Sequence, residues 1–225
     1  MSGEPIFADR SDAGRRLAER LGRYAGRDDV VVLAVPRGGV PVGFEVARAL
    51  GAPLDVLVVR KLGAPGNEEL AMGAVAEGGI RVVNDEVVRT GRIPAWLIDE
   101  ETRLEQTEME RREHDYRGHR PPPVLRGRTV LLVDDGIATG ATIRAALAAL
   151  RAQDPARIVV ATPTAPASAC EELRRDADEV VCLATPEPFY SIALSYEEFP
   201  QLSDEQVDTL LHRAVAPRAG AAAGA

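Results

Sequence analysis

The sequence predicts an α/β protein built on an open, mainly parallel, twisted sheet flanked by helices. Two observations lead to this fold class. The first is a set of short and almost uninterrupted apolar runs, as strands covered on both faces require; they lie at residues 29–35, 130–133, 157–161 and 179–183. The second is that stretches of helical character separate the runs, so that strands and helices alternate along the chain as they do in parallel sheets.

Composition agrees with one compact enzyme-sized domain. The 225 residues suit a single domain with a sizeable core, and the net charge of -8 makes nucleic acid an unlikely partner. There is no apolar run long enough to span a bilayer and no recognisable secretory leader, so we expect a cytoplasmic protein with no membrane partner. Cys170 and Cys182 should then stay reduced.

The first predicted element is a helix with Ser11 as its N-cap, a residue type suited to that position. Several arginines fall along this helix, and we interpret them as a solvated face; they are Arg15, Arg16, Arg20 and Arg23. Arg10 and Asp12 lie where the helix begins. Their side chains could reach a site at the sheet edge, although nothing in the sequence requires it.

A glycine-rich turn follows the apolar run at residues 29–35. It reads Pro36-Arg37-Gly38-Gly39, and Pro41 suits the first turn of the helix that comes next. Arg37 brings a fixed fork of donors, and two glycines let backbone amides approach a diphosphate. The turn therefore predicts an anion site, with an ordinary βα turn as the alternative.

The next predicted strand, residues 54–59, ends next to the one lysine of the chain. Lysine and arginine together number 27, and every other basic residue is arginine. Residues 60–66 are rich in glycine and proline, which predicts a loop. The flexible ammonium of Lys61 could follow a leaving diphosphate as charge develops. A chance lysine in a surface loop is the alternative.

A hairpin and a long helix are predicted next. Residues 70–75 and 80–83 can pair as antiparallel strands, and a helix should run from residue 94 to about 117. So long a polar helix is either a solvated arm or a contact in a homodimer. His114 and His119 lie near its end without cysteine or histidine partners at metal-binding spacing, which favours ordinary surface residues.

The most informative segment begins with the strand at residues 130–133, which leads straight into Asp134 and Asp135. Two carboxylates would repel a bare phosphate, so they should accept hydrogen bonds from ribose hydroxyls or from metal-bound water. The small-residue turn at 138–142 opens backbone amides at the N-terminus of the next helix, where a phosphate can bind. A ribose 5-phosphate would satisfy both halves of the segment.

Individual residues of this turn support the same interpretation. Gly140 should let the backbone approach the phosphate closely, while Thr139 and Thr142 add hydroxyl donors. A Walker A loop is excluded because no Gly-Lys-Ser/Thr ending is present, and there is no glycine pattern for a dinucleotide.

Residues 134–142, Asp-Asp-Gly-Ile-Ala-Thr-Gly-Ala-Thr, resemble the phosphoribosyl pyrophosphate (PRPP) signature of type I phosphoribosyltransferases. The resemblance implies that family's fold in one domain at residues 1–215, with a lid loop at about 60–72, a helical insertion at about 85–119 and a small hood at about 184–201. The segments at 7–14 and 36–41 look most like a bacterial subgroup of the family. Residues 216–225 should form a disordered tail.

The resemblance also assigns site residues. Ribose 5-phosphate binding falls to Asp134, Asp135, Ala138, Thr139, Gly140, Ala141 and Thr142, pyrophosphate binding to Arg37, Gly38, Gly39 and Lys61, and catalysis to Lys61, Arg37, Asp134 and Asp135. The pyrophosphate loop of the family often carries a non-proline cis peptide, which we place at the Pro36–Arg37 bond.

The function implied is transfer of ribose 5-phosphate from PRPP to a small nitrogenous acceptor, with release of pyrophosphate. Mg²⁺ would be the cofactor, held near Asp134 and Asp135 directly or through water. The alternative is a regulatory protein of the same fold that senses PRPP without catalysis. Synthesis of PRPP is disfavoured, because it would need a second domain and an ATP site.

The acceptor is addressed by two observations. Four of the nine aromatic residues lie between Phe189 and Phe199, so Phe189 and Tyr190 could stack on a planar acceptor. The equally plausible alternative is a small satellite core under a long loop. Ala138 stands where enzymes acting on 6-oxopurines usually carry an acid, which argues against hypoxanthine or guanine.

Overall fold

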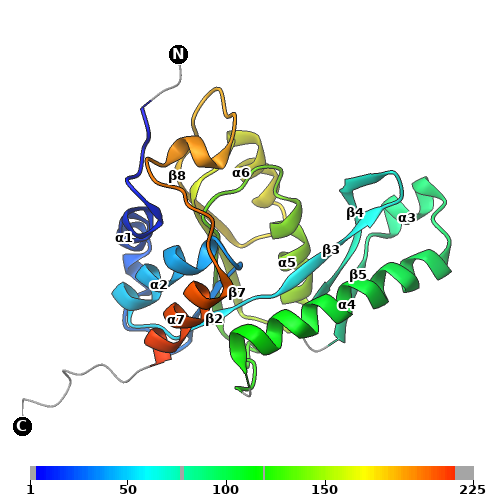
Figure 1. The fold of residues 1–225 in the computed structure, drawn as a ribbon, viewed down its shortest axis with the longest axis horizontal. Helices are drawn as coiled ribbons and strands as arrows, with labels where there is room; N and C mark the ends of the chain where they lie inside the picture. The colour runs from blue at the N-terminus through cyan, green and yellow to red at the C-terminus, as the bar shows by residue number, and fades with distance from the viewer. Residues whose placement is uncertain (1–3, 77–78, 119, 216–225) are drawn as a thin grey trace, which may run out of the picture.

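The computed structural model describes residues 4–76, 79–118 and 120–215. Strands and helices alternate through most of this length (Figure 1). The helices are α1 (Arg10–Arg20), α2 (Gly39–Leu50), α3 (Asp85–Gly91), α4 (Ala95–Arg117), α5 (Ala141–Arg151), α6 (Ala167–Leu173) and α7 (Asp204–Val215). The strands are β1 (Val30–Ala34), β2 (Leu54–Val56), β3 (Val59–Ala64), β4 (Asn67–Ala76), β5 (Ile80–Val83), β6 (Thr129–Val133), β7 (Arg157–Thr164) and β8 (Glu179–Ala184).

The core is a five-stranded parallel sheet in the order β2-β1-β6-β7-β8. Every residue of β1 and β6 is buried, because apolar side chains cover both faces of these central strands. Helices α1, α2 and α7 contribute to the hydrophobic cluster on one face, and α5 and α6 to the cluster on the other. The predicted fold class, an open parallel sheet flanked by helices, is confirmed.

The register of the two central strands sets the position of the site. Ala34 at the end of β1 pairs with Val133 at the end of β6. The turn after β1 and the acids after β6 therefore emerge side by side at the carboxyl edge of the sheet, where open α/β sheets bind ligands.

A second unit, which we call the arm, consists of β3, β4, β5, α3 and α4. Its three strands form an antiparallel sheet in the order β3-β4-β5, and Figure 1 shows this sheet and α4 extending away from the core. The base of α4 is anchored to the core by a buried ion pair, in which Arg117 Nε lies 3.2 Å from Asp55 Oδ2. Tyr116 adds a hydrogen bond of 2.5 Å from its hydroxyl to Asp204 Oδ1 on α7.

The lid loop predicted at about residues 60–72 is a β-hairpin in the structure. Lys61 in β3 pairs with Ala74 in β4, and only Pro65 and Gly66 form the turn between the strands. The glycine and proline residues therefore predicted the position of the turn correctly. The residues on either side of it are strands because they pair with each other, and no local sequence pattern specifies that pairing. The predicted strand at 54–59 likewise divides into β2 and β3.

The structure also tests the predicted second hairpin, the N-cap of the first helix and the long helix. The hairpin at 70–75 and 80–83 is confirmed, with Ala76 opposite Ile80. The N-cap of α1 is Asp9 and not Ser11, because the Asp9 carboxylate accepts a hydrogen bond of 2.6 Å from the amide of Asp12. The long helix is confirmed as α4.

The remaining expectations concern two undescribed segments, membrane spans and the cysteines. His119 and the tail at 216–225 lie outside the described residues. Within the described ranges, no helix has the length and apolar character needed to cross a membrane, and Cys170 and Cys182 are free thiols.

Candidate active site

Asp134 lies directly beyond the end of β6, where the backbone is still held by the sheet. Its amide donates to Ala161 O of β7 at 3.3 Å, and its Oδ1 accepts from the amide of Asp135 at 2.9 Å. Burial raises the pKa of the Asp134 carboxyl, and the neighbouring Asp135 charge raises it further. A cationic or hydrogen-bond-donating ligand would therefore stabilise the ionised form of this group.

Asp135 is held more tightly than its neighbour. Its side chain is buried, and Arg10 of α1 donates from Nε to Asp135 Oδ2 at 2.7 Å. The hydroxyl of Tyr196 donates to the Asp135 carbonyl. Asp135 is thus a junction between the first helix, the end of β6 and the segment that precedes α7.

The predicted pyrophosphate turn packs directly against the two acids. A Cβ added to Gly38 would overlap Asp135 Oδ2, and one added to Gly39 would lie 2.7 Å from the Val133 carbonyl. Only glycine fits at these positions. The bond between Pro36 and Arg37 is cis, as expected. The turn after β1 and the acids after β6 therefore form one continuous surface.

The small-residue turn opens α5 as predicted. Ala138, Thr139 and Thr142 are exposed, and Ala141 donates from its amide to Thr139 Oγ1 at 3.4 Å. Gly140 has a φ of 74°, in the left-handed region that favours glycine, and a Cβ added there would meet no protein atom closer than 3.8 Å. Its close approach to a phosphate stays a prediction. The first-turn amides of α5 have no carbonyl partners within the helix and remain suited to an anion.

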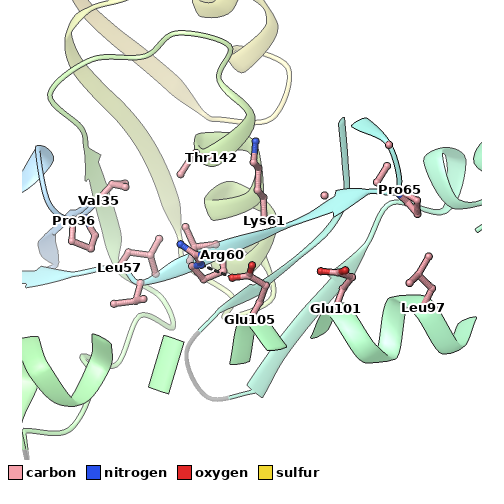
Figure 2. Close-up of a pocket in the computed structure, with 15 residues that line it drawn as sticks. Val35, Pro36, Leu57, Arg60, Lys61, Pro65, Leu97, Glu101, Glu105 and Thr142 are labelled. Atoms are coloured by element: carbon pink, nitrogen blue, oxygen red, sulfur yellow. Dashed lines mark hydrogen bonds and ion pairs between the residues drawn. The ribbon is translucent and has the colours of Figure 1, made fainter. Parts of the chain in front are cut away.

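A cavity of about 630 Å³ joins the predicted elements (Figure 2). It is lined by Pro36 of the pyrophosphate turn, Lys61 of β3 and Thr142 of the phosphate turn. The opposite wall comes from α4 through Glu101 and Glu105. Pro36, Lys61 and Thr142, which are far apart in the sequence, therefore border the same space. The other predicted site residues, among them Asp134, Asp135, Gly38 and Gly39, are not part of its lining.

Arg60 and Lys61 point to opposite sides of β3, because successive side chains alternate along a strand. Arg60 donates from Nε to Glu105 Oε2 on α4 at 2.5 Å, and both side chains are partly buried. Figure 2 shows Lys61 extending instead to the side on which Thr142 lies. The alternation thus directs the lysine, and not the arginine, toward the phosphate turn.

Arg37 does not join this cavity. Its side chain is about half exposed, with Nη1 3.9 Å from Asp204 Oδ1 on α7, and it is not among the residues that line the cavity. The guanidinium would have to turn away from α7 to contact a bound diphosphate. Gly38 and Gly39 do not line the cavity either, and their predicted contact with pyrophosphate stays a prediction.

The aromatic residues of the hood divide into two groups. Tyr196 stacks on Phe199 with ring centroids 4.9 Å apart and also contacts Phe7 at 5.5 Å, so these rings form the small satellite core that was one of the two alternatives. Tyr190 is 74% exposed and Phe189 is partly buried, and neither belongs to that core. Their predicted contact with an acceptor stays a prediction.

The sequence places Arg10 at the start of the first helix but does not predict its contact with Asp135. Arg10 and Asp135 are 125 positions apart, and no local pattern links them. The one available signal is that Arg10 follows the capping residue Asp9, which fixes its position at the start of a helix. Tyr196 lies in the aromatic-rich segment between Phe189 and Phe199, and no local pattern links its hydroxyl to the carbonyl of Asp135.

The acids fit Mg²⁺ only in a limited way. The described residues contain no group of three or more histidine, cysteine or acidic side chains that could enclose a metal. One Asp135 oxygen is already bound to Arg10, which leaves Asp134 as the less constrained carboxylate. Mg²⁺ is commonly held by one or two carboxylates together with water and substrate phosphates, and this donor set suits that arrangement.

Comparison with known proteins identifies the family. The family profile described as "Phosphoribosyl transferase domain" matches residues 6–197. The chain belongs to this family. The phosphoribosyl transferase domain therefore includes β1, β6, both predicted phosphate-binding turns and the arm.

Two further similarities agree with membership of the phosphoribosyl transferase family. The chain is 50% identical over 209 residues to a protein of Mycobacterium tuberculosis named "Putative phosphoribosyl transferase", a match that covers 93% of this chain and 47% of the relative. The chain thus spans about half the length of the curated relatives it matches. It is also similar to the crystal structure of TT1426 from Thermus thermophilus, with 43% identity, a TM-score of 0.86, and coverage of 93% of this chain and 99% of that one.

Proposed function

We propose that this protein transfers ribose 5-phosphate from PRPP to a small nitrogenous acceptor and releases pyrophosphate, with Mg²⁺ as cofactor. The observation that carries the proposal is the shared cavity. Lys61, Pro36 at the start of the pyrophosphate turn, and Thr142 in the first turn of α5 border one space. The acids that follow β6 do not line this space, but Asp135 contacts Gly38 of the same turn. Family membership supports the same reaction class.

Each part of PRPP has a matching surface in the site. The 5-phosphate would bind the amides at the start of α5, with Thr139 and Thr142 as hydroxyl donors. The ribose hydroxyls would donate to Asp134. The diphosphate would lie against Gly38 and Gly39, where the backbone is free of side chains.

In the proposed reaction, the bond between ribose C1 and the pyrophosphate oxygen breaks, and its electron pair leaves with pyrophosphate. The acceptor nitrogen forms the new bond to C1 with its lone pair and afterwards loses a proton. Lys61 would offset the negative charge that develops on the leaving group. Mg²⁺ would supply further charge neutralisation on the diphosphate when bound.

The arm gives the proposed site its cover. β3 carries Lys61 into the cavity, and α4 forms the wall opposite the phosphate turn. A wall of this kind would limit the access of water to the reacting carbon, which protects PRPP from hydrolysis. Phe189 and Tyr190 remain our candidates for contact with the acceptor, and Ala138 favours an acceptor other than hypoxanthine or guanine.

The test is release of pyrophosphate from PRPP with Mg²⁺ across a panel of nitrogenous bases and amines. We expect release with at least one acceptor, a strong decrease in turnover in Lys61→Ala, and partial activity in Lys61→Arg, which keeps the charge. Tight binding of PRPP without release for any acceptor would contradict catalysis and favour the PRPP-sensing regulator. Equal turnover in the wild type and Lys61→Ala would overturn the role of Lys61.

A further inference from the structure

Arg10 and Asp135 form a buried ion pair beside the proposed site, and the proposed reaction does not use it. Arg10 is 9% exposed and Asp135 is 8% exposed. Charged side chains are rarely this buried unless they are paired, because removing a charge from water is costly. The burial of both charges beside the proposed site therefore indicates that the ion pair has a function there.

The guanidinium of Arg10 is held from three directions. Nε donates to Asp135 Oδ2 at 2.7 Å, and Nη1 donates to the carbonyl of Pro200 at 2.8 Å. The ring of Phe199 lies beneath it, with the guanidinium carbon 3.7 Å from the ring centroid. These contacts fix the guanidinium in place beside the carboxylate.

The Asp135 oxygen that accepts from Arg10 also meets the turn proposed to bind diphosphate. A Cβ at Gly38 would overlap Asp135 Oδ2, so the carboxylate is in direct contact with the turn. Asp134 adds a second acid next to it. Without compensation, a carboxylate here would repel a diphosphate, and the repulsion would be strong because the surroundings are buried.

We propose that Arg10 is a positioning residue that neutralises and fixes Asp135, so that a diphosphate can bind beside this carboxylate. Asp134 is then the acid that contacts the ribose. The inference rests on the proposed function in one respect, because it takes the turn at 36–39 as the diphosphate site. It refines the expectation that both acids bind the ribose in the same way.

The test measures the affinity of inorganic pyrophosphate, with Mg²⁺, by calorimetry. Arg10→Met should bind pyrophosphate about tenfold more weakly or worse, because an unpaired carboxylate then faces the turn. The double variant Arg10→Met/Asp135→Asn should recover affinity to within about threefold of the wild type, because the repelling charge is gone. Arg10→Lys should lie between the wild type and Arg10→Met.

A merely structural role could also give this recovery, because neutralising Asp135 relieves an unpaired buried charge. Ribose 5-phosphate is therefore the second probe: a structural role would weaken both ligands alike in Arg10→Met, whereas the inference expects the larger loss for pyrophosphate, and equal losses would overturn it. Unchanged affinity in Arg10→Met, or a double variant as weak as the single one, would overturn the inference. Circular dichroism checks the folding of each variant. If Arg10→Met does not fold, the affinity of Asp135→Asn for pyrophosphate is the deciding measurement. This variant should bind pyrophosphate at least as tightly as the wild type does, and weaker binding would overturn the inference.

Ribose 5-phosphate binding separates the two acids. Asp134→Asn should weaken it about tenfold, whereas Asp135→Asn should change it by less than about threefold, because only Asp134 would contact the sugar directly. The reverse order would overturn the inference. A wild-type protein that binds neither pyrophosphate nor ribose 5-phosphate would overturn the proposed function and this inference together.

Discussion

The core sheet and the arm are built on different physical principles. The core strands β1 and β6 are buried along their whole length and owe their position to apolar packing on both faces. In β3 of the arm, by contrast, only Leu62 and Ala64 are buried, and Arg60 forms an ion pair with Glu105 of α4. The core carries the backbone turns of the proposed site, and the arm carries Lys61. The site is thus assembled from a tightly packed part and a more weakly held one.

The largest difference should appear in global stability. Leu132 in β6 is fully buried, so Leu132→Ala should lower the free energy of unfolding by about 2–5 kcal/mol. The matched control is Leu104→Ala on α4, where the side chain is 49% exposed and the loss should be below about 1 kcal/mol. Urea unfolding followed by circular dichroism measures both. Equal losses would contradict the stabilising effect of burial that is assigned to Leu132.

The next effect concerns the close contact between the two core turns. In Gly39→Ala the added methyl would lie 2.7 Å from the Val133 carbonyl, and the overlap should cost about 1–3 kcal/mol of stability. The displaced turn should also weaken pyrophosphate binding. Gly22→Ala is the control, because a Cβ there meets nothing within 4 Å. Thermal unfolding and calorimetry test this prediction, and a Gly39→Ala variant that matches Gly22→Ala in both would refute the packing argument.

A smaller effect should be confined to the arm. Glu105→Gln removes a partly buried ion pair with Arg60, and such pairs contribute on the order of 1 kcal/mol or less. Hydrogen exchange should accelerate in β3 and β4 and stay unchanged in β1 and β6. Glu100→Gln, which breaks an exposed pair with Arg103 on the same helix, is the control. Faster exchange throughout the core would show that arm and core unfold as one unit.

The smallest effect lies at the far end of the core sheet and depends on pH. Hydrogen bonds from Arg27 and Thr129 lower the pKa of Asp29 to about 2, from an ordinary value of 3.8. This carboxylate therefore stabilises the fold above about pH 4, and its contribution is lost as the pH falls through about 2.

Asp29→Asn should accordingly be less stable than the wild type at pH 6, and the difference should shrink as the pH decreases below 4. Urea unfolding at several pH values measures it, with the neighbouring exposed Asp28→Asn as the control. A difference that stays constant from pH 6 to pH 3 would contradict the assignment to the Asp29 charge.

The same contrast explains what could be predicted from the sequence. The parallel strands and the turn at 134–142 follow from local patterns, because apolar runs and small residues at a helix start act within a few positions. The hairpin of β3 and β4 depends on pairing between residues such as Lys61 and Ala74, and no local pattern specifies it. The same holds for Arg10, whose partner is 125 positions away. The direction of the Arg37 side chain depends on α7, which is also distant in sequence.

Trp96 is the only tryptophan of the chain, and it lies on α4 with 68% of its surface exposed. Indole fluorescence therefore reports from the arm alone. Because this indole is already largely in water in the folded protein, its emission should change little when the core unfolds. A change on addition of PRPP would instead signal movement of the arm. The protein thus contains its own optical probe for the one part of the site that the core does not hold.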